Sequence, residues 1–191
     1  MTRRILCGVA MAALSMLALG SLVGPARAGD DKGKIDCADT DLGFAVPGYS
    51  VECSDLSDSA VSTDHDLAAE RVKKLFAIDS SAGLTFLTAV DITVLGGRVY
   101  MQRVGLFEEI QNHFDQTEIT DWQDVDAVAG FDTAQFVGIF RNGPRLDCVG
   151  FRRVVNRQYE GIGREVFGIA CSSNGHRQAS EALQHLKAPG A

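Results

Sequence analysis

The segment that decides the fold runs from Phe131 to Cys171 and reads FDTAQFVGIFRNGPRLDCVGFRRVVNRQYEGIGREVFGIAC. Apolar residues alternate with others over 131–140, 146–155 and 165–171, which is typical of strands. Asn142-Gly143 separates the first two of these segments, and this dipeptide is a strong signal for a tight hairpin. The segment therefore predicts a meander of three consecutive antiparallel strands.

The second hairpin of the meander also predicts a disulfide. A turn centred on 158–161 places Cys148 opposite Cys171, with 150 opposite 169 and 152 opposite 167. Side chains that lie directly opposite each other on one face of a sheet are close enough for a disulfide bond.

The other cysteines are Cys7, Cys37 and Cys53. Cys7 lies in a segment that we expect to be removed, so four cysteines remain, and four allow three pairings. We predict the local pairing, Cys37–Cys53 with Cys148–Cys171. The alternatives are a metal site and a redox-active pair, and neither fits a chain without C-x-x-C spacing.

The N-terminus has the order of residues found in secretory signal peptides. Arg3 and Arg4 come first, 5–23 is uncharged and apolar, and 25–28 reads PARA, which is an A-x-A cleavage site. We expect cleavage after Ala28 and a periplasmic or secreted protein. The alternatives are an uncleaved anchor and, from the arginine pair, twin-arginine export.

The charge of the chain excludes several partners. The full sequence carries a formal net charge of −7, and cleavage after Ala28 removes three arginines, which makes the charge more negative still. This balance argues against binding of nucleic acid or anionic lipid. No second apolar run is long enough to span a bilayer, so we expect no membrane segment after cleavage.

The remaining segments predict a mixture of strands and helices. They are two short strands around Pro47-Gly48, a helix over 64–77, a strand over 84–94, a helix over 106–115, a polar loop over 121–126, and a final helix capped by Ser173 or Asn174 and ended by Pro189-Gly190. We expect an α+β fold, with helices packed on an antiparallel sheet. The predicted organisation is a signal peptide (1–28), an acidic arm (29–42) and a single domain (43–191).

Residues 44–49, FAVPGY, resemble the opening hairpin of the PsbP/DcrB/Mog superfamily. The expected order of later elements is also similar, with an antiparallel meander that ends in FGIA at 167–170 and is followed by a helix. The resemblance implies an exported or lumenal non-enzyme that binds protein partners or supports larger assemblies. The cysteine pairs are not part of that pattern, and no site residue of the superfamily carries over.

Carboxylates gather around the single tryptophan, Trp122. Asp121, Asp124 and Asp126 are its neighbours, which fits either a sugar or calcium site or a surface loop in which Trp122 plugs the core. Asp64-His65-Asp66 could ligate a metal, but its position at a predicted helix start is explained by capping. Glu109 and His113 are four residues apart and share one helical face. We expect no metal and no cofactor.

The second notable charge feature is a run of arginines. Arginine forks bind carboxylates and phosphates, so these residues indicate either internal ion pairs or a surface for an acidic protein partner or an anionic envelope component. The candidate partner-binding residues are Arg141, Arg145, Arg152, Arg153, Arg157 and Arg164, together with Trp122.

These features favour a non-catalytic exported module that binds a protein or serves the envelope, since the sequence has no G-x-S-x-G, Walker or H-E-x-x-H motif. Two alternatives stay open. A small-ligand carrier needs an apolar pocket between sheet and helices. A hydrolase acting on envelope polymers needs two carboxylates opposed across a cleft, one with a raised pKa, and would draw them from Asp121, Asp124, Asp126, Glu108 and Glu109.

Overall fold

One antiparallel sheet organises the part of the chain that the computed structural model describes, which is residues 33–57, 69–79, 81, 84–95, 101, 104–114, 117–140, 143–158 and 161–190. The expected signal peptide, the Asp64-His65-Asp66 triplet and Arg141 lie outside these residues. The elements are β1 (Lys34–Ile35), the 3-10 helix η1 (Cys37–Asp39), β2 (Gly43–Phe44), β3 (Ser50–Asp55), β4 (Ala69–Asp79), β5 (Thr85–Leu95), α1 (Leu106–His113), β6 (Thr117–Val128), β7 (Phe131–Phe140), β8 (Arg145–Gln158), β9 (Gly161–Ser172), α2 (His176–Gln184) and β10 (Leu186–Lys187).

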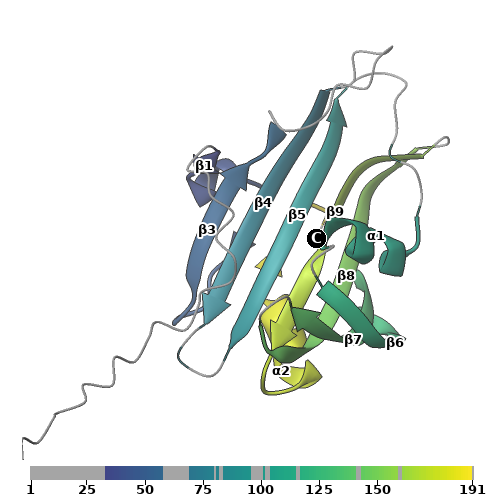
Figure 1. Ribbon diagram of the computed structural model, residues 1–191. Coiled ribbons are helices and arrows are strands. Elements are labelled where there is room, and N and C mark those ends of the chain that lie inside the picture. Colours follow the sequence, from purple (N-terminus) through teal and green to yellow (C-terminus); the bar gives the residue numbers. More distant parts are fainter. Residues whose placement is uncertain are drawn as a thin grey trace, which may run out of the picture.

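Within the described residues the main sheet has eight strands in the order β1-β3-β4-β5-β9-β8-β7-β6, and β2 pairs separately with β10. Figure 1 shows β9 beside β5, so the last strand of the meander joins the two halves of the sheet. The predicted meander is β7-β8-β9, and its register is confirmed, with Cys148 opposite Cys171, Gly150 opposite Ile169, and Arg152 opposite Phe167. Both predicted disulfides are present.

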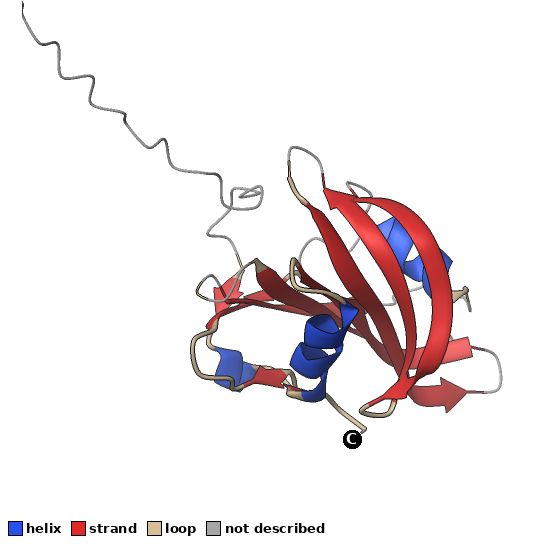
Figure 2. Cartoon of the chain, turned by 90° about the horizontal axis from the view of Figure 1, so that it is seen from below, coloured by secondary structure: helices blue, strands red, loops and turns tan. Residues whose placement is uncertain are grey.

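The two helices lie on opposite faces of this sheet (Figure 2). Alternate residues of a strand point to opposite faces. On β8, Val149 and Phe151 pack in the cluster that contains Leu183 of α2, whereas Cys148 packs in the cluster that contains Ile110 of α1. The sheet is therefore buried on both sides where β8 and β9 cross its centre.

The predicted helix over 64–77 is wrong where the structure describes it, because residues 69–79 form the strand β4. This strand pairs along both of its edges, with β3 and with β5. Leu75 and Ala77 are fully buried on the α2 face, while Val72 and Phe76 are half-buried on the other. A strand with apolar residues on both faces loses simple alternation, and its pattern then resembles helical spacing.

The predicted polar loop over 121–126 is also wrong, because these residues belong to the edge strand β6. The strand is irregular, with register shifts between Thr120 and Gln123 and between Val125 and Val128, and Asp121 has a φ of 56°. Bulges and charged side chains are common on edge strands, since both discourage pairing with another chain. The aspartates of 121–126 therefore belong to an exposed edge strand and not to a loop.

The two ends of the domain differ in detail from the prediction. The strands near Pro47-Gly48 exist, but β2 pairs with β10 and not with β3. The residue before helix α2 is Gly175, not the predicted Ser173 or Asn174, and it provides no side-chain cap. The helix ends at Gln184, before β10, and not at Pro189. The predicted antiparallel sheet with helices packed on it is confirmed, but most of the described secondary structure is strand and not helix.

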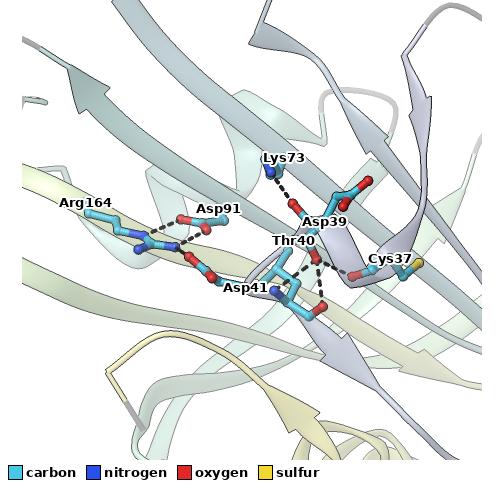
Figure 3. A network of polar contacts seen from close by, with 8 residues as sticks. Cys37, Asp39, Thr40, Asp41, Lys73, Asp91 and Arg164 are labelled. Carbon is cyan, nitrogen blue, oxygen red and sulfur yellow. Dashed lines mark hydrogen bonds and ion pairs between the residues drawn. The ribbon is translucent and has the colours of Figure 1, made fainter.

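Residues 33–42 of the predicted acidic arm are part of this fold. β1 pairs with β3, and Leu42 is buried in the cluster on the α2 face. Asp41 pairs with Arg164 of β9, which also binds Asp91 of β5 through two hydrogen bonds of 3.0 and 2.6 Å. Figure 3 shows this network, in which Lys73 of β4 also donates a hydrogen bond to the Asp39 carbonyl. These ion pairs and hydrogen bonds link the start of the domain to three strands of the sheet, β4, β5 and β9.

Candidate functional site

An open groove of about 440 Å³ lies where the start of α1 meets β6 and β7. Its lining combines aromatic side chains with carboxylates. The lining residues are Gly105, Leu106, Phe107, Trp122, Asp124, Val125, Ala127, Asp132 and Thr133. The groove is thus built from the start of α1 and from the hairpin of β6 and β7.

Two aromatic rings form the apolar side of the groove. The Trp122 indole stacks on Phe136 with ring centroids 5.5 Å apart, and Phe107 meets Trp122 edge-to-face at 5.1 Å. Trp122 also packs against the cluster under α1, which agrees with its interpretation as a core plug. Phe107 is 40% exposed and is the one large hydrophobic side chain classed as exposed among the described residues. Phe107 and Trp122 together supply the aromatic part of the groove's lining.

Only one of the three carboxylates that the sequence pattern singled out beside Trp122 lines the groove. Asp124 lines the groove and accepts a hydrogen bond from Trp122 Nε1 at 3.1 Å. Asp121 instead pairs with Arg145 at 3.3 Å, and Asp126 is exposed and does not line the groove. Asp132 of β7 lines it but was not predicted. Asp132 could have been found only from the pairing of β6 with β7. Asp124 lies opposite Ala134, and Asp132 is two positions from Ala134 on the same strand, so it points to the same face of the sheet.

The predicted arginine surface is dispersed over the molecule. Arg152 Nη1 donates to the Val104 carbonyl at 2.6 Å, and on the opposite face Arg153 lies over the Phe131 ring and donates to the Gly130 and Ala129 carbonyls. Arg145 and Arg164 are in the ion pairs described above, and Arg157 lies in β8. Partners within the chain are thus present for Arg145, Arg152, Arg153 and Arg164, as the internal-pairing alternative predicts.

A second group of charged residues is buried beneath α1. Glu165 of β9 is 2% exposed, and its Oε2 has no hydrogen-bond partner among the described residues. Burial, and to a smaller extent the neighbouring Glu109, raise its pKa to about 7, while Arg152 opposes the rise. Burial also raises the pKa of Glu109, while His113, whose Nδ1 is 3.2 Å from Glu109 Oε1, opposes that shift. With a pKa of about 7, the Glu165 carboxyl gains or loses its proton near neutral pH.

This buried glutamate predicts that stability falls as the pH rises. The folded chain holds the Glu165 proton more tightly than the unfolded chain, so its contribution declines between the ordinary glutamate pKa of 4.5 and about 7. We expect Glu165→Gln to reduce the loss of unfolding free energy between pH 5 and pH 8 by about 2 kcal/mol. Denaturant titrations at both pH values measure this loss.

The matched control for that titration is Glu118→Gln, which removes the same charge from an exposed position on β6. It should leave the pH dependence of the wild-type chain intact. An unchanged loss of stability in Glu165→Gln would show that Glu165 is ionised in the folded chain throughout this range.

No group of three or more His, Cys, Asp or Glu side chains in the described ranges converges in a way that could hold a metal ion. No helix in those ranges is both long and apolar enough to span a bilayer. Comparisons with protein-family models, curated proteins and solved structures found no match to this chain.

Proposed function

We propose that the chain is a non-catalytic exported module that binds a protein partner in the groove between α1, β6 and β7. The observation that carries this proposal is the pair of aromatic side chains, Phe107 and Trp122, presented beside two carboxylates in one open groove. Protein interfaces concentrate their binding energy in aromatic residues that are surrounded by a polar rim. The groove has both features at a size that fits a few side chains.

The internal contacts of the arginines support the groove as the binding surface. A guanidinium that already binds a carboxylate or a carbonyl has less to offer a partner, because its hydrogen bonds must first be broken. Arg164 is the clearest case, since two aspartates bind it. Of the candidate partner-binding residues, we therefore assign the binding role to Trp122 and the residues beside it in the groove, and not to the arginines.

The cysteines support the compartment. Disulfides persist in oxidising environments such as the periplasm and the extracellular space, and the structure contains two. Together with the signal-peptide pattern they favour a periplasmic or secreted protein. The resemblance of residues 44–49 to the PsbP/DcrB/Mog superfamily supports the same class of function.

The hydrolase and carrier alternatives have weaker support. The carboxyl groups with raised pKa values are Glu109 and Glu165, and neither lines the groove. A general acid must reach the bond that it protonates, so these two groups do not combine with Asp124 or Asp132 into a cleft of opposed carboxylates. A carrier site is largely apolar, whereas carboxylates form part of this groove.

Site-specific photo-crosslinking in the native cells tests the proposal. A photoreactive phenylalanine analogue at position 107 should form one discrete adduct, because a bound partner contacts that position. The control places the same analogue at Arg177, whose side chain is 91% exposed on α2, on the opposite face of the sheet. Trp122→Ala should reduce the adduct at position 107 several-fold. Equal yields at positions 107 and 177, or no adduct at either, would contradict the proposal.

A further inference from the structure

Negative charge surrounds the groove. Asp124 and Asp132 line it and are both exposed, and Glu108 follows Phe107 in the first turn of α1. Asp126 is exposed on the same strand as Asp124. Carboxylates close together in a partly enclosed space attract cations, because their potentials add and the protein walls exclude part of the screening solvent.

The nearest described cations do not neutralise this charge from inside the groove. Arg145 pairs with Asp121 instead. Arg152 lies opposite Asp132 on the neighbouring strand β8, and its Nη1 donates a hydrogen bond to the Val104 carbonyl just before α1. Neither arginine is among the lining residues. The carboxylates of Asp124 and Asp132 therefore keep acceptor capacity for a ligand.

The start of α1 could favour an anion, since backbone N–H groups without partners carry partial positive charge. Gly105 gives this helix no side-chain cap. However, Glu108 and Glu109 occupy the first turn, and two carboxylates there compensate the positive end of the helix. The charge that a ligand meets in the groove is consequently negative.

The aromatic wall suits the same type of ligand. The ring of a tryptophan attracts guanidinium and ammonium groups, and a guanidinium also stacks on it. The hydrogen bond from Trp122 Nε1 to Asp124 holds the indole and one carboxylate in a fixed relation. Aromatic rings beside carboxylates suit an arginine side chain, because the rings attract its charge and the carboxylates accept its N–H groups.

Building on the proposed function, we propose that the groove binds an arginine or lysine side chain from a basic segment of the protein partner. Arginine is the better fit because its fork can bind a carboxylate with two N–H groups while its charge lies near the aromatic rings of Phe107 and Trp122. The partner thus has a charge opposite to the one that the arginine run indicated.

Trp122 makes this proposal directly measurable, since it is the only tryptophan of the chain. Titration with a hexa-arginine peptide should change its fluorescence in a saturable way, hexalysine should bind more weakly, and hexaglutamate should leave the emission unchanged. Binding should weaken as the salt concentration rises, because the attraction is electrostatic. A response to hexaglutamate as strong as that to hexa-arginine would overturn the proposal.

Two variants with the same charge change separate the groove from general acidity. Asp132→Asn removes a lining carboxylate and should weaken hexa-arginine binding five- to tenfold. Asp126→Asn removes an exposed carboxylate that does not line the groove and should change it less than twofold. Phe107→Ala should weaken it about threefold. Equal losses in the two aspartate variants would show that the peptide senses only net charge.

The two proposals fail in different ways. A discrete crosslink at position 107 without a response to hexa-arginine, or a crosslink that Asp132→Asn leaves unchanged, would keep the protein-binding groove and reject its basic ligand. A hexa-arginine response without any crosslink would keep the cation site and reject the protein partner at Phe107. Unchanged thermal unfolding of Asp132→Asn, whose side chain is exposed, would show that its effect on binding is local.

Discussion

Replacing Gly168 with alanine should destabilise the protein by about 4 kcal/mol or more, or prevent it from folding. Gly168 lies in the centre of β9, opposite Ala89 of β5 and Phe151 of β8. A Cβ atom at this position would lie 2.0 Å from the Thr88 backbone oxygen and 2.6 Å from Phe151 Cζ. The backbone of β5 cannot move away without losing its pairing with β9, so the clash has no inexpensive relief.

The matched control for this substitution is Gly43→Ala in β2. A Cβ there would meet only the Lys187 side chain, at 3.6 and 3.8 Å, which is ordinary contact. Denaturant unfolding should show Gly43→Ala within about 0.5 kcal/mol of the wild-type chain. A Gly168→Ala variant of near wild-type stability would mean that β5 and β9 approach each other less closely than described here.

Arg164→Met should cost about 3–5 kcal/mol, because it leaves the carboxylate of Asp91 buried without its charge partner. Asp91 is 4% exposed, and Arg164 binds both of its oxygens. Arg164 also holds the pKa of Asp41 below its usual range, but the Asp41 side chain is 65% exposed, and solvent weakens that second pair. The buried pair therefore accounts for most of the expected loss.

Two further variants separate these contributions. Asp41→Asn should cost less than about 1 kcal/mol, as expected for an exposed ion pair. The double variant Arg164→Met with Asp91→Leu should recover most of the stability lost in Arg164→Met, since an apolar pair often replaces a buried ion pair without loss. Equilibrium unfolding of the four proteins measures both effects. A small loss in Arg164→Met would contradict the account of a buried ion pair between Arg164 and Asp91.

The meander and its disulfide could be predicted because a hairpin sets its own register. Once the turn is placed near residue 159, the pairing of Cys148 with Cys171 follows from counting along two strands. Strand β4 could not be predicted in the same way. Its partners, β3 and β5, are the strands next to it in the sequence, but burial on both faces removed the alternation that identifies a strand.

The groove was only partly predictable for a related reason. Trp122 and Asp124 could be recognised as a local cluster, but Phe107 and Asp132 join them only after α1 has packed against the sheet and β7 has paired with β6. The buried Glu165 depends on the same packing, since its raised pKa comes from burial and from Glu109 on the helix above it. Local patterns identify residues that act with their neighbours, whereas this site is assembled by tertiary contacts.

Hydrogen–deuterium exchange of the chain with and without hexa-arginine tests the location of the binding site most directly. The groove predicts slower exchange at the start of α1 and along the facing parts of β6 and β7, around residues 105–107 and 122–133, with no change in β3 and β4. The same pattern should disappear in Asp132→Asn. Protection that falls on β3 and β4, or that persists unchanged in Asp132→Asn, would contradict the assignment of this groove as the binding site.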